Sequence, residues 1–461
     1  MAVWSEVPVS VIHNNYGRLD AEFFRPEYLQ IDNILQRLPI RKLKTITNKI
    51  DVGHVGPMVK HYCEDGVLFI QTQQIGEFFL DLSACVRIDH SFHELLKKSQ
   101  VNNGNILIAR SGSFGKASIY MENEVINSAD IIIIDINKDQ QDINNLYLLA
   151  FLNSKYGSAQ LIRYASGGLQ GHVNLTILED FKVPVIPTPI QEDIRQKVRI
   201  AYEKTAQSIA LYNNAKQLLE SELGLDKLVF EKPIGYEASF SEVVGNNRAD
   251  ADYYQVPFRQ IEKHLSNLTV KPLAKIASFT KGIEVGSKYY ASSGKLFIRV
   301  SNVKENGVET GNSDKYISNE LFNQLPSFQP QVGELLLTKD GTPGICYVVD
   351  EITEGVISSG IVKMKMVDQD LSPEYLALVI NSKICRMQIE RACSGALIVH
   401  WKPVEIGRLK IPILSSKLRQ EISDLAQKSK NARRESARLL SQAKKRVEDL
   451  IEEATNHEPV S

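Results

Sequence analysis

A segment rich in glycine and serine with a single lysine, ARSGSFGKASI at residues 109–119, has the residue types of a phosphate-binding loop. A P-loop requires the pattern G-x-x-x-x-G-K-[ST], in which backbone amides surround the phosphates and the hydroxyl reaches magnesium. Here Gly115 and Lys116 are followed by Ala117, and Arg110 stands where the first glycine is needed. The segment therefore fails the pattern at two positions, and we predict a turn with another role.

The patterns of other enzymes that act on nucleic acids are missing from the sequence. It contains no Asn-Pro-Pro-aromatic string, which an adenine methyltransferase needs to hold its flipped base, and no G-x-S-x-G elbow of a hydrolase. Carboxylates such as Asp130 and Asp135 are scattered, whereas a metal-dependent nuclease needs them clustered with a lysine. Five cysteines without a C-x-x-C pair indicate neither a disulfide framework nor a zinc site. We therefore predict that the chain has no catalytic activity, no cofactor and no metal.

The glycine turn occurs a second time in the sequence. The segment TKDGTPGICYV, which begins at Thr338, aligns with ARSGSFGKASI at an offset of 229 residues, and both glycines of the turn coincide. In both copies a short apolar segment precedes the turn, and a basic residue, Arg110 or Lys339, stands beside it. Each copy is therefore predicted to be a strand followed by a Gly-x-x-Gly turn.

The duplication extends over the whole chain. Pairs of similar segments follow one another in the same order, at offsets of 228–230 residues. They are RLDAEFF at residue 18 and RADADYY at 248, FIQTQQIGE at 69 and FIRVSNVKE at 297, YLLAFLNSK at 147 and YLALVINSK at 375, and FKVPVIP at 181 and LKIPILS at 409. Such regular order and spacing predict a tandem duplication of about half the chain.

A long helix is predicted after each copy. The first runs from about residue 190 to 223, where Gly224 is a suitable stop, and the second runs from about residue 418 to 453. Apolar and small residues recur at three- and four-residue spacing, which is the pattern of a coiled-coil seam. The predicted helix-contact residues are Ile194, Val198, Ala201, Tyr212 and Leu219 in the first helix, and Ile422, Leu425, Ala432, Leu439 and Leu450 in the second. The alternative is that each helix packs only on its own globular half.

With its duplicated segments and two long helices, the chain resembles the specificity subunits of type I restriction–modification systems. The stretches that carry the resemblance are GNILIARSGSFGK and GELLLTKDGTPGI, together with ASGGLQGHVNLTILEDFKVPVIPTPIQEDI and ACSGALIVHWKPVEIGRLKIPILSSKLRQEI. The resemblance covers nearly all of the chain. At one point the halves differ, because the start of the second helix, SSKLRQEI, lacks the proline of TPIQEDI.

The resemblance implies an α+β protein in which two similar α/β target-recognition domains alternate with two long helices that pair as an antiparallel coiled coil. The first domain would cover residues 1–187, the first helix 188–231, the second domain 232–415 and the second helix 416–461. Each domain would read one half of a split double-stranded DNA target, with the helices as a spacer. Methyltransferase subunits, expected in two copies, would dock on this frame, and a translocating restriction subunit is a further expected partner.

Side chains suited to DNA gather around the duplicated segments. Lysine and arginine bind phosphates, glutamine and asparagine can bond adenine bidentately, and arginine can bond guanine. The DNA-contact candidates of the first half are Gln71, Gln73, Gln74, Arg110, Ser111, Ser113, Lys116, Arg163 and His172. Those of the second half are Arg299, Asn302, Lys339, Thr342, His400 and Lys402. The alternative is that these residues belong to turns and strand edges that face only solvent.

Composition bears on the choice between functions. The formal net charge is −1 over 461 residues, so attraction to DNA must come from local patches. The first residues, MAVWSEVPVS, lack the regions of a signal peptide, and the apolar run IIII at residues 131–134 is too short to span a bilayer. We therefore expect a cytoplasmic protein that does not contact membranes. Two further functions stay open: a protein–protein scaffold that binds no DNA, and the recognition subunit of a methylation-only system.

Overall fold

The chain forms two compact units, each of which contains one globular half and a part of each long helix. The computed structural model describes residues 4–15, 17–112, 114–137, 139, 142–165, 173–231, 233–311, 313–393 and 400–456. Unit 1 comprises residues 1–205 and 434–461, and unit 2 comprises residues 206–433. Within the described ranges, no helix is both long enough and apolar enough to cross a membrane.

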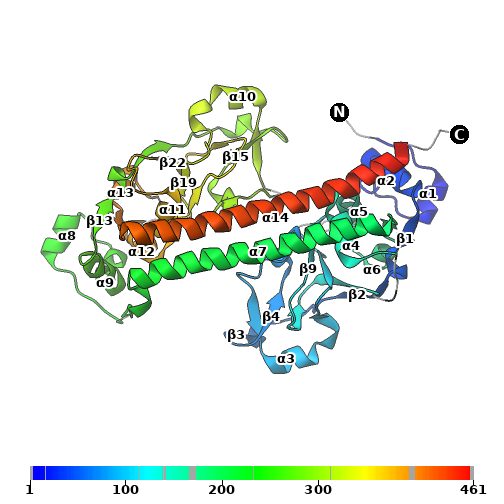
Figure 1. Ribbon diagram of the computed structural model, residues 1–461, viewed down its shortest axis with the longest axis horizontal. Coiled ribbons are helices and arrows are strands. Elements are labelled where there is room, and N and C mark those ends of the chain that lie inside the picture. Colours follow the sequence, from blue (N-terminus) through cyan, green and yellow to red (C-terminus); the bar gives the residue numbers. More distant parts are fainter. Residues whose placement is uncertain are drawn as a thin grey trace. The chain divides into compact units, whose positions relative to one another are not determined.

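Two sheets form the globular half of unit 1 (Figure 1). The strand order of the first is β2 (Thr47–Val52), β11 (Ile131–Ile136), β8 (Ile106–Ala109), β9 (Ala117–Ile119) and β5 (Phe78–Phe79). The order of the second is β3 (Tyr62–Cys63), β6 (Val86–Ile88), β4 (Val67–Ile70), β10 (Ile126–Ser128) and β7 (Gln100–Val101). A separate antiparallel pair joins β1 (Ile40–Lys42) to β12 (Lys182–Pro184). The β-branched run of β11 is buried on both faces, which explains why it is apolar without alternation.

Helices pack on both sheets of unit 1, and Phe92 of the third helix lies in a core with Phe69 and Ile88 of the second sheet. The helices are α1 (Val9–Asn14), α2 (Pro26–Gln36), α3 (His90–Leu95), α4 (Asn145–Asn153), α5 (Lys155–Ala165) and α6 (Leu175–Glu179). The central one is α4, which begins where the Asn144 side chain accepts a hydrogen bond from the Tyr147 amide at 2.7 Å. Its leucines share one apolar core with Ile106, Ile108 and Ile132 of the sheet. The core of unit 1 therefore lies between α4 and the strands β8 and β11.

Unit 2 repeats this architecture. Its larger sheet has the order β14 (Ala277–Lys281), β22 (Ile361–Met366), β19 (Leu335–Thr338) and β20 (Cys346–Val348), and its smaller sheet has the order β18 (Lys315–Ile317), β15 (Lys295–Ile298) and β21 (Gly355–Ile357). The strands β13 (Val270–Pro272) and β23 (Lys410–Pro412) pair as β1 and β12 do, and β16 (Val303–Lys304) pairs with β17 (Gly307–Val308). The helices α8 (Phe240–Asn246), α9 (Val256–Leu265), α10 (Asn319–Gln324), α11 (Pro373–Asn381), α12 (Lys383–Cys393) and α13 (Pro403–Arg408) follow in the order of α1–α6. The predicted duplication is therefore visible in the order of the helices and in the central strands, although among the described residues the sheets of unit 2 have four and three strands where those of unit 1 have five each.

A repeated asparagine ties the central helix to the larger sheet in both units. Asn153 ends α4, and its side chain accepts from the Ala117 amide at 3.0 Å and donates to the Ala117 carbonyl at 2.8 Å. Asn381 ends α11 and bonds the amide and carbonyl of Cys346 in the same way, at 2.9 and 2.7 Å. Because a buried strand group without a partner is costly, this pairing explains the repeated Asn-Ser-Lys string.

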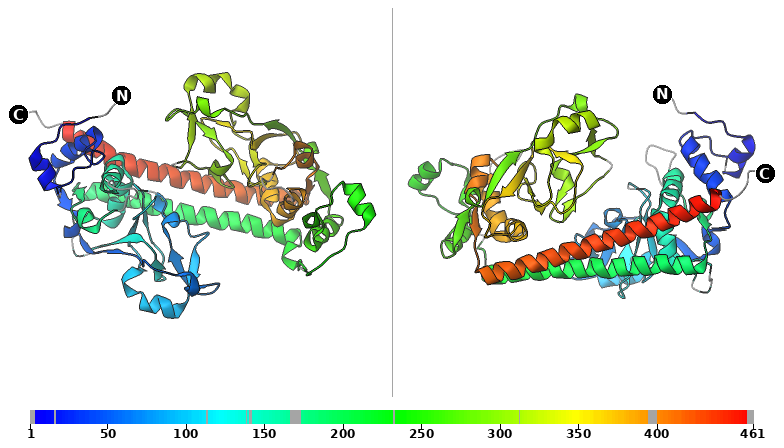
Figure 2. Two further views of the ribbon diagram at one scale, coloured as in Figure 1. Left: turned by 180° about the vertical axis from the view of Figure 1, so that it is seen from behind. Right: turned by 45° about the horizontal axis from the view of Figure 1, so that its top comes forward.

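The long helices α7 (Thr188–Glu222) and α14 (Ser416–Asn456) lie side by side within each unit (Figures 1 and 2). In unit 1 the Ser436 hydroxyl donates to the Ala201 carbonyl at 2.8 Å, and Thr205 and Ser436 lie 2.8 Å apart at their oxygens. In unit 2 the hydroxyls of Ser208 and Ser429 each donate to the other residue's carbonyl, at 2.8 and 2.7 Å. Residues later in α7 bond to residues earlier in α14, so the two helices are antiparallel, as predicted.

The helix bounds lie close to those expected from the sequence. Gly224 has a φ of +65°, the left-handed conformation in which helices often end, two residues after α7. Most of the predicted helix-contact residues are buried, namely Ile194, Val198, Ala201, Leu219, Ile422, Ala432 and Leu439. Tyr212 and Leu425 are half-buried against the core of unit 2. Leu450 is also half-buried, whereas Val447 and Ile451 are the buried positions at this end of α14.

Candidate nucleic-acid interface

Gln71, Arg110 and Ser111 lie near one another in unit 1, where two parallel strands end. Strands β4 and β10 pair in parallel, with Phe69 opposite Asn127. The Ala129 amide donates to the Ile70 carbonyl at 2.9 Å just beyond the paired strands. Because the carboxyl ends of parallel strands lie at the same edge, Gln71 and the residues after Ala129 leave the sheet side by side.

The glycine turn of unit 1 is held at this edge by Asp130. The Arg110 guanidinium donates to Asp130 Oδ1 at 2.8 Å, and the Ser111 hydroxyl donates to Asp130 Oδ2 at 3.1 Å. About a third of the Arg110 side chain remains exposed, at 32%. Gly112 and Gly115 have φ values of +82° and +85°, so glycine is needed at both corners of the turn.

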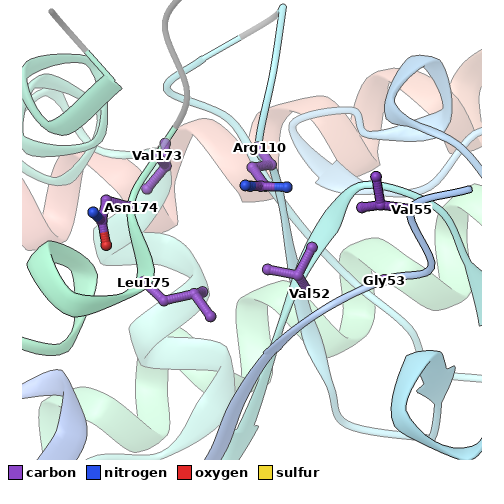
Figure 3. Close-up of a pocket in the computed structure, with 7 residues that line it drawn as sticks. All are labelled: Val52, Gly53, Val55, Arg110, Val173, Asn174 and Leu175. Atoms are coloured by element: carbon purple, nitrogen blue, oxygen red, sulfur yellow. The ribbon is translucent and has the colours of Figure 1, made fainter.

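A second segment returns to the same turn. The Val173 amide donates to the Arg110 carbonyl at 3.2 Å, and Val173, Asn174 and Leu175 line one side of a pocket (Figure 3). Arg110, Val52 and Val55 line its other side, and the Arg110 guanidinium faces the opening between the two groups (Figure 3). Two of the predicted contact residues, Ser113 and His172, lie outside the described residues.

Unit 2 has the same arrangement with different side chains. We call this arrangement the corner: a cation paired with a carboxylate, and a returning segment, beside the glycine turn. The Lys339 ammonium donates to Asp340 Oδ2 at 2.6 Å, and His400 Nδ1 lies 2.8 Å from Asp340 Oδ1. The Trp401 amide donates to the Lys339 carbonyl at 2.9 Å, as Val173 does to Arg110. Burial acts to raise the pKa of Asp340, but the hydrogen bonds from Lys339 and His400 outweigh it and hold the pKa below its ordinary value.

The carboxylate of this corner has changed its place in the sequence between the two units. In unit 1 it is Asp130, just before β11, whereas the corresponding residue of unit 2 is Gly360. In unit 2 it is Asp340 in the turn, where unit 1 has Ser111. Both units therefore keep a cation beside a carboxylate. From the sequence, Asp130 was considered only as one of several scattered carboxylates, and its pairing with Arg110 was missed. The Asp-to-Gly and Ser-to-Asp differences between the aligned repeats carry the signal.

The polar residues after β4 divide into a buried residue and two accessible residues. Gln74 is 3% exposed, and its side-chain oxygen accepts from the Gln71 amide at 3.0 Å, so it closes a tight turn. Asn302 does the same for the Arg299 amide at 2.9 Å and is also 3% exposed. Gln73 is exposed, whereas Gln71 and Arg299 are half-buried. The structure thus exposes Gln73, leaves Gln71 and Arg299 half-buried, and buries Gln74 and Asn302. The Arg299 guanidinium also donates to the Ser313 carbonyl at 2.5 Å.

Arg163 lies in a structural cluster away from the turn. It is 3% exposed, its Nε donates to the Phe23 carbonyl at 2.8 Å, and its Nη1 pairs with Asp32 at 3.0 Å. Its guanidinium carbon also lies 4.1 Å from the centre of the Phe23 ring. We therefore leave Arg163 out of the surface considered for DNA contact.

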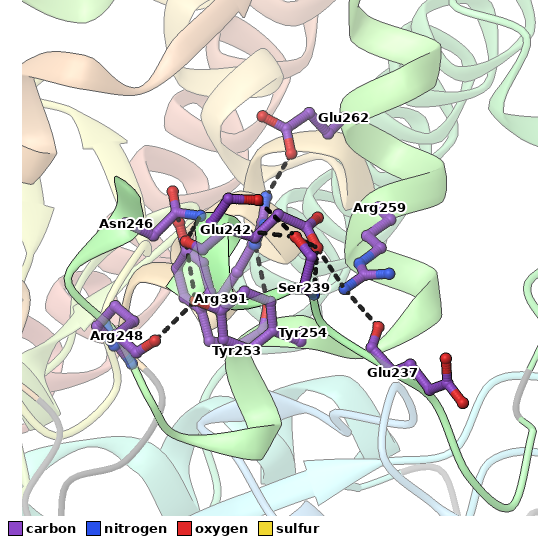
Figure 4. A network of polar contacts seen from close by, with 11 residues as sticks. Glu237, Ser239, Glu242, Asn246, Arg248, Tyr253, Tyr254, Arg259, Glu262 and Arg391 are labelled. Carbon is purple, nitrogen blue, oxygen red and sulfur yellow. Dashed lines mark hydrogen bonds and ion pairs between the residues drawn. The ribbon is translucent and has the colours of Figure 1, made fainter. Parts of the chain in front are cut away.

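Unit 2 repeats this cluster with its own residues. Arg391 donates to the Tyr253 carbonyl at 3.1 Å, pairs with Glu262 at 2.7 Å and lies 4.3 Å from the Tyr253 ring centre. Figure 4 shows this cluster, in which Arg248 contacts the same tyrosine ring at 4.9 Å. The repeated RLDAEFF and RADADYY strings therefore have a packing role.

Three further candidates lie at the surface. Lys116 follows the glycine turn of unit 1 and is exposed, and Thr342 is exposed in the corresponding turn of unit 2. Lys402 is exposed and immediately precedes α13, where its amide donates to Glu405 at 3.3 Å. Within the described residues no cluster of three or more histidine, cysteine, aspartate or glutamate side chains is arranged to hold a metal ion. The side chains described at the two glycine turns carry cationic, carboxylate, imidazole and hydroxyl groups.

Comparison with known proteins identifies the class of domain. Residues 69–210 match the family Methylase_S, the type I restriction modification DNA specificity domain. This range begins in β4, includes the glycine turn and ends within α7. Residues 69–210 thus match the model of a DNA specificity domain, in agreement with the resemblance of the chain to specificity subunits of type I restriction–modification systems.

Solved structures of the same kind share low sequence identity with this chain. The S subunit of the type I restriction-modification system from M. genitalium is 12% identical, with 90% of this chain and 95% of that chain covered and a TM-score of 0.43. The HsdS subunit from Thermoanaerobacter tengcongensis is 12% identical, with 91% and 96% covered and a TM-score of 0.29. No curated protein sequence matches the chain.

Proposed function

We propose that this chain reads DNA sequence for a type I restriction–modification complex, with each unit reading one half of a split target. The observation that carries the proposal is the duplicated corner. Both units place a cation–carboxylate pair and a returning segment beside a glycine turn. The accessible side chains next to it differ, with Gln71 in one unit and Arg299 in the other. A duplicated surface with diverged side chains suits the reading of two different half-sites.

We assign two kinds of contact to this surface. The cations would bind phosphates and supply affinity, whereas the amides and the guanidinium of Arg299 would contact base edges. The proposed contact residues are Gln71, Gln73, Arg110, Ser111 and Lys116 in unit 1, and Arg299, Thr342, His400 and Lys402 in unit 2. Lys339 is left out because it is only 8% exposed and its ammonium pairs with Asp340. Ser113 and His172 stay proposed on their sequence positions alone.

The proposed domain boundaries follow the two long helices. Target-recognition domains would cover residues 1–187 and 232–415, with α7 and α14 as the spacer that sets the unspecified gap of the target. Two methyltransferase subunits and a restriction subunit would bind this frame, because the family of residues 69–210 is that of type I systems. Catalysis would belong to those partners, and this chain would contribute none.

The decisive experiment maps DNA methylation with and without this chain. The chain is co-expressed with a candidate methyltransferase subunit from the same genome, any complex is purified, and methylated adenines are mapped across the genome. We expect a methylated motif with two short specified parts and an unspecified gap, which is lost when this chain is deleted. An unchanged methylation pattern together with no stable complex would contradict the proposal and favour the protein–protein scaffold.

A binding experiment tests the role of the cations in the glycine turn. Affinity for a duplex with the mapped motif should fall as salt rises, because phosphate contacts release counterions. Arg110→Ala should weaken binding to all sequences and make the slope of log K against log salt shallower by about 0.9. Arg41→Ala, which removes a cation from β1 that pairs with Asp142, is the matched control. Equal slopes for the wild-type chain and Arg110→Ala would remove Arg110 from the contact surface.

A further inference from the structure

The exposed glutamine of unit 1 stands on a turn that is fixed at several points. The turn over residues 72–74 follows β4 directly, and the buried side chain of Gln74 closes it through the Gln71 amide. The Gln74 carbonyl accepts from the Asp81 amide at 3.0 Å, and the next turn is held by the Gly76 amide, which donates to Ser118 at 3.0 Å. The backbone that carries Gln73 is therefore positioned by strand β9 and by its own buried neighbour.

A chain of hydrogen bonds orients the Gln73 side chain. The Gln71 carboxamide donates through Nε2 to the Tyr62 hydroxyl at 3.3 Å, which leaves its Oε1 as the acceptor. The Gln73 Nε2 donates to that Oε1 at 3.0 Å. One hydrogen of Gln73 Nε2 is used in this way, and the second hydrogen and Oε1 remain on an exposed side chain. These two groups form an adjacent donor and acceptor when the hydrogen given to Gln71 is the one trans to Oε1.

This remaining pair has the chemistry that matches adenine. In the major groove, adenine presents the N7 acceptor beside the N6 donor, and a glutamine carboxamide pairs with both. Guanine presents two acceptors, and cytosine presents a donor without the adjacent N7. A carboxamide whose orientation is fixed before binding loses less entropy on contact than a freely rotating side chain.

We propose that Gln73, oriented by Gln71 and Tyr62, reads one adenine in the half-site of unit 1. The inference rests on the proposed function and deepens it by naming a base and a reader. For this adenine Gln73 is the contact residue, whereas Gln71 and Tyr62 act only by holding Gln73 in position. Unit 2 has Ser301 at the position of Gln73 and Arg299 at that of Gln71, so it lacks this carboxamide chain.

The test compares base preferences of the complete complex of this chain with its methyltransferase subunit. Methylated motifs are mapped for the wild-type chain, Gln73→Ala and the control Gln217→Ala, which changes an exposed glutamine on α7. Binding is then measured on duplexes in which each specified base of the mapped motif is replaced in turn. For Gln73→Ala we expect the discrimination for adenine at one position of one half-site to fall by about 10-fold or more, with the other half-site unchanged.

The positioning residues give a second, graded readout. Tyr62→Phe removes the hydroxyl that orients Gln71 and should reduce discrimination at the same position by a smaller factor than Gln73→Ala. A purely structural role of Tyr62 would lower stability without changing the preference at that base. If Tyr62 orients Gln73 through Gln71, Tyr62→Phe and Gln73→Ala must both reduce discrimination at the same base of the motif.

The outcomes separate the inference from the proposed function. If the wild-type complex yields no motif that depends on this chain, the proposed function itself fails. If the motif is found and Gln73→Ala alters no position, or relaxes a position that does not specify adenine on either strand, the assignment of Gln73 is overturned while the proposed function stands. Gln73 is exposed, so its replacement by alanine is not expected to disturb folding.

Discussion

At the scale of single residues, Arg110 and Arg163 were both predicted from the sequence to contact DNA, but the structure gives them different surroundings. Arg163 is 3% exposed and pairs with Asp32, whereas about a third of Arg110 is exposed beside Asp130. A buried ion pair that loses one partner leaves an uncompensated charge, which is far more costly than the loss of a surface pair. Burial therefore separates the structural arginine from the arginine that can reach a ligand.

Replacement of Arg163 should destabilise unit 1. Arg163→Met leaves the Asp32 carboxylate with Lys182 alone, and we expect a loss of about 3 kcal/mol in the free energy of unfolding. The equivalent change in unit 2, Arg391→Met, should cost about 1 kcal/mol, because Glu262 is 54% exposed. Denaturant unfolding of the two variants measures the difference, and equal losses would contradict this explanation.

The ionisation of Asp340 makes unit 2 sensitive to acid. Its pKa is held below the ordinary value of 3.8, so its charged form stabilises the folded state at pH values above 3.8. That stabilisation is lost as the pH falls through the pKa of the folded state. Asp340→Asn should therefore be less stable than the wild type at pH 7, and the difference should disappear on acidification. A difference in unfolding free energy that stays constant from pH 7 down to about pH 2 would argue against the ion pairs as its cause.

At the scale of elements, the two glycines of the first turn differ in their surroundings. Both have positive φ, but a Cβ at Gly112 would meet nothing within 4 Å, whereas a Cβ at Gly115 would lie 2.6 Å from Ser158 Oγ and 3.0 Å from Ile162. Gly115 is therefore the point at which the turn packs against α5.

A pair of alanine variants separates backbone strain from packing. Gly112→Ala should cost about 1–2 kcal/mol of stability through the left-handed backbone alone. Gly115→Ala should cost more, because Ser158 or Ile162 must also shift. Thermal unfolding of both variants gives the comparison, and a smaller loss for Gly115→Ala would refute the proposed contact with α5.

Much of the fold was predictable from the sequence because the repeat marks equivalent elements. The segments around Asn153 and Asn381 align, and the structure gives both the same role at the end of a helix. The periodicity of α7 and α14 predicted the helix pairing, but it selected Leu450 where Ile451 is buried, since a seam drifts along a long helix.

The candidate surface was predictable only in outline. Contacts such as Ser111 with Asp130 depend on strand pairing that brings residues 19 positions apart together. The parallel pairing of β4 with β10 also leaves no signal in a single sequence, yet it places Gln71 at the edge where the glycine turn lies. Likewise, composition cannot tell the buried Gln74 from the exposed Gln73, because the turn geometry decides which carboxamide points inward.

At the scale of the whole molecule, unit 1 is completed by a segment from the far end of the sequence. Ala443, Val447 and Ile451 of α14 are buried in the same apolar core as α4 and Ile194. Lys444 and Glu77 form an ion pair at the surface of this unit. The first globular half therefore depends on residues that follow the second.

Disruption of this segment should affect unit 1 selectively. Val447→Asp places a charge in the core of unit 1, and hydrogen exchange should become faster in α4 while α11 of unit 2 keeps its protection. Gln442→Asp, at an exposed position of α14, is the matched control and should leave both helices protected. Equal acceleration in α4 and α11 would show that the two cores do not unfold separately.

Unit 1 contains segments from both ends of the sequence, and this determines the order in which the two units can complete folding during translation. Residues 206–433 form unit 2 without a gap, so its whole sequence has been synthesised before residue 434 is added. Unit 1 cannot complete its folding until residues 434–456 have been synthesised, although its first residues are synthesised earliest. Domains commonly finish folding from the amino terminus onward during translation. In this chain the half that is started first is the half that is finished last, so its core stays incomplete until the end of α14 has been synthesised.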